Sequence, residues 1–243
     1  MLALARVPSE FDPQSLSNTV WAFATAGLAT PALLDVIAAE AAGRVREFKP
    51  QDIANTAWAF AAADYLPIES SLFDQRFARR CEALAHEFND YELRQLHQWR
   101  LWYACERGCS DGLPGATLLA RCAAVFRVSE AQPSHMQRQV ANAVVSLGAS
   151  VQEEVVLEEG YSLDMVVSFG GGQRFAVGVD GPSHFWERVP TSATLLKRRQ
   201  LKHFGWKLIW VPHWQWAHHV TPPFLQQAAY LRDLFSSEAH RPC

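Results

Sequence analysis

Two aspartates at predicted strand positions have the residue type and spacing to hold a divalent metal ion. Asp164 lies in the alternating stretch 161–169, and Asp180 ends the apolar strand that follows it. Carboxylate oxygens are the preferred ligands of Mg²⁺ and Mn²⁺, and a metal held in this way activates water for hydrolysis. Glu153 and Glu154 are acidic neighbours on the preceding predicted strand.

The turn after this strand has a structural interpretation as well as a functional one. Asp180 precedes a Gly181-Pro182 pair, and a carboxylate there can accept backbone N–H bonds and fix the turn. Ser183 and His184 follow at once. At the carboxyl end of a strand these two side chains could contact phosphate or ribose, or they could hydrogen-bond within the loop. Both interpretations stay open.

A run of cations with aromatic residues beyond it suggests RNA. The predicted helix 194–204 carries the cations, and the aromatic residues follow the predicted strand 206–211. Cations bind phosphates and accessible rings stack on unpaired bases, which suits single-stranded RNA. A basic helix alone is more often a solvated face. The RNA-binding candidates are Ser183, His184, Lys197, Arg198, Arg199, Lys202, Trp214 and Trp216.

The second half of the chain has the pattern of an α/β domain. Helical spacing alternates with period-two stretches, and a run of three glycines predicts a hairpin between two of the strands. The predicted elements are a helix at 134–147, strands at 151–157, 161–169 and 173–179, a helix at 194–204, a strand at 206–211 and a helix at 222–235.

The first half contains an internal repeat. Residues 16–24 recur as residues 53–61, an offset of 37 (55 minus 18), and a weaker third copy begins near Glu92. Such a period is typical of stacked helical hairpins. We interpret Trp21, Phe23, Trp58 and Phe60 as packing residues, and residues 72–88 as one long helix. The polar pairs Asn18/Asn55 and Thr19/Thr56 are either inter-repeat hydrogen bonds or groups that read successive bases.

Composition limits the classes of function. Of the 243 residues 49% are hydrophobic and 19% charged, which indicates globular domains, and the net charge of −3 requires any nucleic-acid surface to be local. Five cysteines without a CxxC pair suggest free thiols in a reducing compartment. No run approaches the ~18 apolar residues of a membrane span. We predict helical repeats at 1–109, a linker and capping helix at 110–132, and an α/β domain at 133–237.

Four motifs in order resemble the RAP domain. They are VDGPSHF at 179–185, TLLKRRQL at 194–201, GWKL at 205–208 and VPHWQW at 211–216, and the resemblance covers roughly residues 134–234. The RAP domain is similar to the restriction-endonuclease-like fold. The repeats resemble those that precede RAP domains in organellar RNA-maturation proteins of the FAST-kinase-like or octotricopeptide-like kind.

The resemblance implies an organellar RNA-binding protein that acts in RNA processing, stability, translation or ribosome assembly. It implies a mitochondrion or plastid, although the opening residues are too short for a convincing transit peptide, and we expect the chain to be part of a longer protein or a mature form. Ribosomal or other ribonucleoprotein proteins are further expected partners. The alternatives are a metal-dependent RNA endonuclease using Asp164 and Asp180 with Mg²⁺ or Mn²⁺, and a protein-binding scaffold.

Nucleases of this fold place an acidic-x-lysine pair on the third strand. Here Gly178 and Asp180 occupy those two positions, and RAP domains commonly carry glutamate where Gly178 stands. A site lacking both a ligand and the lysine loses much of its transition-state stabilisation. We therefore expect no catalytic activity, and no cofactor unless the nuclease alternative holds.

Overall fold

The computed structural model describes residues 11–67, 71–128, 133–170, 172–218 and 223–239. The chain forms two compact units. The helical unit runs to Val128 and includes Thr191–Leu196, and the α/β unit comprises Ser129–Pro190 and Lys197–Cys243. None of the helices in the described ranges is long and apolar enough to cross a membrane.

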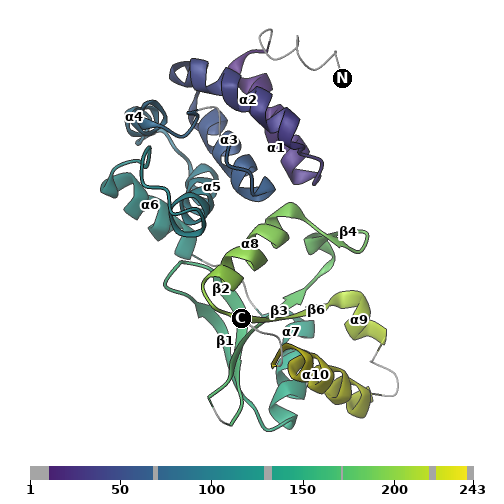
Figure 1. The fold of residues 1–243 in the computed structure, drawn as a ribbon. Helices are drawn as coiled ribbons and strands as arrows, with labels where there is room; N and C mark the ends of the chain where they lie inside the picture. Colours follow the sequence, from purple (N-terminus) through teal and green to yellow (C-terminus); the bar gives the residue numbers. More distant parts are fainter. Residues whose placement is uncertain (1–10, 68–70, 129–132, 171, 219–222, 240–243) are drawn as a thin grey trace. The chain divides into compact units, whose positions relative to one another are not determined.

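The helical unit consists of helices whose starts are encoded locally. They are α1 (Pro13–Thr25), α2 (Pro31–Arg44), the short η2 (Val45–Glu47), α3 (Pro50–Ala63), α4 (Gln75–Ala83), α5 (Asp90–Arg100), the π-helical η3 (Leu101–Glu106) and α6 (Ala116–Arg127) (Figure 1). Proline opens α1, α2 and α3, where its missing N–H costs no hydrogen bond. The predicted long helix over 72–88 is wrong, because Asp74 caps α4 and Leu84 ends it.

The sequence repeat corresponds to a row of hydrogen bonds between helices. Asn55 on α3 donates to Asn18 Oδ1 on α1 (3.3 Å), and Gln95 on α5 donates to Asn55 Oδ1 (3.2 Å). Asn55 and Gln95 are buried, and the Trp58 indole N–H donates to Gln98 on α5 (3.0 Å). These polar groups join successive helices, so the base-reading interpretation of Asn55 is wrong.

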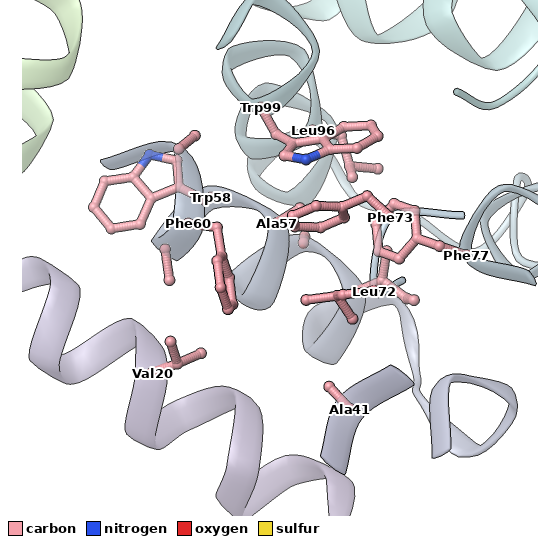
Figure 2. Close-up of a cluster of buried hydrophobic side chains, with 14 of the residues drawn as sticks. Val20, Ala41, Ala57, Trp58, Phe60, Leu72, Phe73, Phe77, Leu96 and Trp99 are labelled. Carbon is pink, nitrogen blue, oxygen red and sulfur yellow. The ribbon is translucent and has the colours of Figure 1, made fainter. Parts of the chain in front are cut away.

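Aromatic side chains fill the core of the helical unit (Figure 2). Phe73 lies at the centre, with its ring 5.6 Å from that of Phe60, 5.1 Å from that of Phe77 and 5.3 Å from that of Trp99. Trp58 and Phe60 are buried as predicted. Phe23 is 41% exposed, so its assignment to the packing set is wrong.

The α/β unit is built on a four-stranded mixed sheet in the order β1-β2-β3-β6 (Figure 1). Its main elements are α7 (His135–Ser146), β1 (Ser150–Val156), β2 (Ser162–Ser168), β3 (Arg174–Asp180), α8 (Ser192–His203), β6 (Lys207–Pro212) and α10 (Pro223–Ala239). The first three strands are antiparallel, whereas β6 runs parallel to β3 after the α8 crossover. The predicted helical half followed by an α/β domain is confirmed.

The predicted order of helix, three strands, helix, strand and helix is present, with three additions. A 3₁₀ turn, η4 (Pro182–His184), follows β3 and leads into a hairpin of β4 (Phe185–Trp186) and β5 (Val189–Pro190). A short helix, α9 (His213–His218), follows β6 directly. Sequence periodicity missed these elements because each spans too few residues to establish a period.

The two faces of the sheet have different environments. Met165, Val167, Phe175, Val177 and Ile209 belong to a core that also contains side chains of α7 and α10. Because side chains alternate along a strand, Asp164, Gly178, Asp180 and Trp210 belong to the opposite face. Tyr161 ties α8 to this side of the sheet through a hydrogen bond to Gln200 Oε1 (2.6 Å).

Candidate functional site

The side chain of Asp164 on β2 bonds to the main chain of the neighbouring strand β3. Its Oδ2 accepts a hydrogen bond from the backbone N–H of Val179 (2.6 Å). Burial raises the pKa of the Asp164 carboxyl above its ordinary value, while the Val179 bond and the charge of Lys197 act in the opposite direction. Asp164 thus has a structural task that holds β2 and β3 together.

Glu154 approaches Asp164 from β1. Its backbone has a left-handed φ of 52°, which interrupts the regular ladder at this position. The buried Gln137 of α7 donates to Glu154 Oε1 (2.7 Å) and to the main-chain carbonyl of Asp164 (3.0 Å). We define the carboxylate cluster as Glu154, Asp164 and Asp180.

Lys197 of α8 lies within reach of this carboxylate cluster. Burial lowers the pKa of the Lys197 ammonium, and the charges of Asp164, Asp180 and Glu154 offset part of that effect. Lys197, one of the predicted RNA contacts, therefore lies in the field of three protein carboxylates. The lysine that the third strand lacks is supplied near the cluster by the crossover helix.

Arg198 is held even more firmly. Its Nη2 contacts Asp180 Oδ2 at 2.5 Å, and its guanidinium lies 4.4 Å from the centre of the Trp210 ring. The Asp180 side chain is only 5% exposed. Arg198, predicted to contact RNA, is thus engaged by pairing and stacking within the protein. Asp180 binds α8, with the exposed His184 Nδ1 3.7 Å from its other oxygen.

Trp210 explains why glycine occupies position 178. Gly178 and Trp210 are register partners in the parallel β3–β6 pair. A Cβ added to Gly178 would lie 2.0 Å from Cζ3 of the Trp210 ring. The ring on which Arg198 stacks therefore requires glycine beneath it, and a metal-binding carboxylate has no space there.

The arrangement does not fit a divalent metal. A hydrogen bond from Val179 engages Asp164, Arg198 engages Asp180, and Lys197 places a further positive charge among the carboxylates. Within the described ranges no group of three histidine, cysteine or acidic residues has the spacing of a metal site. These contacts describe an internal ion-pair network that fastens α8 to the sheet.

The two tryptophans predicted to stack on bases also have internal roles. Trp216 is 2% exposed, and its indole N–H donates to Gln139 of α7 (3.2 Å), so its assignment as an accessible ring is wrong. Trp214 is partly buried, with its ring 4.4 Å from that of Phe185 in an edge-to-face contact. Trp214 thereby anchors the β4–β5 hairpin.

The hairpin presents a residue that the sequence analysis missed. Trp186 is 80% exposed, and Val189, its cross-strand partner, is 65% exposed. Phe185 faces the opposite way, onto Trp214, as strand alternation requires. The two-residue loop contains Glu187, with φ of 57°, and the exposed Arg188. Each strand of this hairpin is only two residues long, so the sequence offers no periodic signal for it.

Several predicted positions do lie at the surface. Ser183, His184 and Lys202 are exposed, and Arg199 is partly buried. The structure therefore divides the predicted RNA-binding set into an exposed part (Ser183, His184 and Lys202), a partly buried part (Lys197, Arg198, Arg199 and Trp214) and the buried Trp216.

Comparison with known proteins identifies the domain. Residues 177–234 match the family model described as the RAP domain. A chloroplastic RAP domain-containing protein of Oryza sativa subsp. japonica is 30% identical over 115 residues, which cover 46% of this chain and 17% of the rice protein. The chain therefore carries a RAP domain, as its motifs predicted, and it aligns with only a small part of that relative.

Proposed function

We propose that this chain binds single-stranded RNA in an organelle and acts in RNA processing, stability, translation or ribosome assembly. The observation that carries the proposal is the 80% exposed Trp186 on an anchored hairpin within a RAP domain. An indole with this exposure offers a stacking surface for an unpaired base, an interaction of about 1–3 kcal/mol per base. Burying Trp186 against a base would also remove an isolated apolar side chain from water.

The surroundings of Trp186 suit a nucleic acid. Edge-to-face contact with Trp214 holds Phe185, so the hairpin is organised before any ligand arrives. Arg188 in the loop is exposed and supplies a cation two residues from Trp186 in the chain. Lys202 and His184 are further exposed basic groups of the same unit. These local groups matter because the net charge of −3 gives no general attraction for RNA.

The plastid is the first compartment to test, because the rice relative is named as chloroplastic. We favour binding without cleavage over the nuclease alternative, because Lys197 and Arg198 already neutralise the carboxylate cluster. With Mg²⁺ or Mn²⁺ we expect no RNA cleavage above background, and Asp164→Asn should leave RNA affinity unchanged. Cleavage in Mn²⁺ that Asp164→Asn abolishes would establish the nuclease instead.

Fluorescence anisotropy with labelled oligouridine tests the proposal. Trp186→Ala should weaken binding by roughly 5- to 150-fold, the equivalent of one lost base stack. Val189→Ala is the matched control, because it removes the exposed cross-strand partner without removing a ring. Equal affinity of Trp186→Ala and wild type would exclude stacking on this hairpin. No binding by the wild-type chain would refute the proposed function itself.

A further inference from the structure

Helix α4 of the helical unit carries three arginines on one face. Arg76, Arg79 and Arg80 share that face with Ala83, following the helical spacing of three, four and seven residues. The other face is apolar, and Phe77 and other side chains from it are buried in the unit's core. Because that packing fixes the rotation of the helix, the arginine face must point away from the core.

A fourth arginine meets this face from η2. Arg46, Arg76, Arg79 and Arg80 line a pocket of about 300 Å³, and Ala83 completes the lining. We call this the arginine pocket. Among the residues that the structure describes, no acidic side chain lines it, so four positive charges surround one small volume.

Two of the four arginines have partners among the residues that the structure describes. Arg76 pairs with Asp74 (2.8 Å), and Arg80 donates from Nε to the main-chain carbonyl of Phe48 (2.8 Å). Arg46 and Arg79 are exposed and have no hydrogen bond or ion pair with any part of the chain that the structure describes.

Nearby acidic residues are engaged elsewhere. Glu47, next to Arg46 in the chain, pairs with Arg44 (2.9 Å). Glu82 of α4 accepts a hydrogen bond from the backbone N–H of Gly115. Like charges held together repel, and a bound anion would remove that repulsion. Guanidinium groups match phosphate oxygens in a bidentate geometry, which makes phosphate the best-fitting anion.

We propose that the arginine pocket binds backbone phosphates of RNA. The inference rests on the proposed RNA-binding function and extends it to the helical unit. Its described lining residues offer no aromatic ring for a base and no carboxylate for a ribose, so the pocket binds phosphate and is independent of sequence. Other residues, such as Trp186, then make the contacts to bases.

The salt dependence of oligouridine binding by the full chain tests this assignment. The measured quantity is the magnitude of the slope of log affinity against log salt concentration. For a single strand, each phosphate that the protein no longer neutralises reduces this slope by about 0.7, so Arg46→Gln/Arg79→Gln should reduce it by about 1.4. The control is Arg138→Gln/Arg232→Gln, which removes the same charge from exposed positions on α7 and α10. The control should keep the wild-type slope.

The outcomes separate the two claims. No binding by wild type would refute the proposed function and this extension of it together. Binding by wild type with an unchanged slope in Arg46→Gln/Arg79→Gln would overturn the arginine pocket alone. A third outcome would reassign the pocket to free phosphate. In that outcome Arg46→Gln/Arg79→Gln and wild type have equal salt-dependence slopes for RNA, but calorimetry shows that this variant alone has lost binding of inorganic pyrophosphate. If the variant fails to fold, Arg46→Lys/Arg79→Lys replaces it. That variant should keep the slope but weaken binding, and unchanged affinity would overturn the pocket.

Discussion

Helices α4 and α8 contain similar clusters of cations but place them in opposite environments. In α4 the residues are Arg76, Arg79 and Arg80, and in α8 they are Lys197, Arg198 and Arg199. The α4 arginines line a pocket that has no acidic side chain among its described lining residues. On α8, Lys197 and Arg198 turn towards buried carboxylates and a tryptophan ring. From the sequence, the cations of α8 were the RNA-binding candidates, and those of α4 were not.

The difference shows that the surroundings of a basic helix decide its role. On the sheet face that meets α8, Asp164 and Asp180 lie on neighbouring strands. Their carboxylates interact with Lys197 and Arg198 within the folded protein. The face of α4 that carries its arginines meets η2, where the one acidic residue, Glu47, is paired with Arg44. Charge left uncompensated by the fold is the charge available to a ligand.

The largest effect is predicted for a substitution that removes one member of the buried ion pair between Arg198 and Asp180. Arg198→Gln should destabilise the protein by about 3–5 kcal/mol, because Asp180 would remain buried without its charge partner. Arg79→Gln should change stability by no more than about 0.5 kcal/mol, as expected for an unpaired surface residue. Urea unfolding of both variants measures the contrast, and equal stabilities would break the comparison between α8 and α4.

A smaller effect is expected at the glycine beneath Trp210. Gly178→Ala should cost about 1–3 kcal/mol, because the new methyl group overlaps the ring on which Arg198 stacks. Gly43→Ala in α2 is the control, since nothing lies within 4 Å of an added Cβ there. It should stabilise by about 0.5–1 kcal/mol. A thermal melt in which both variants gain stability would show that Trp210 does not cover Gly178.

The smallest effect concerns pH. The folded protein holds the pKa of Lys197 below its ordinary value of 10.5. Between those two pKa values the unfolded chain binds more protons, so this group makes stability rise as the pH rises through that window. Lys197→Met should abolish this contribution.

The same variant should move a second titration. Lys197 lowers the pKa of Asp164, so its removal should raise that pKa further. Carboxyl NMR titration of both proteins measures the shift. An unmoved Asp164 titration would mean that Lys197 does not lie at the carboxylate cluster.

The sequence predicted most elements because their signals are local. Period-two stretches located β1, β2 and β3, and Ser134 marked the start of α7 through its side-chain cap. The repeat at an offset of 37 also placed Asn18 and Asn55 at equivalent positions, and a hydrogen bond joins them.

The candidate site was harder to predict because its contacts join distant residues. Arg198 and Asp180 are 18 residues apart, and the direction of the Arg198 side chain depends on the tertiary packing of α8. Position 178 looked like a missing metal ligand until Trp210, on another strand, showed why glycine is required there. The exposure of Trp186 depends on a hairpin too short to leave a periodic signal.

Photo-crosslinking tests most directly the claim that the exposed groups contact RNA and that Lys197 and Arg198 do not. The full chain would be irradiated with oligomers containing 4-thiouridine, and crosslinked peptides would be identified by mass spectrometry. We predict crosslinks to the hairpin at Trp186 and to peptides of the arginine pocket on η2 and α4. Crosslinks confined to Lys197 and Arg198, with none at Trp186 or α4, would contradict the account.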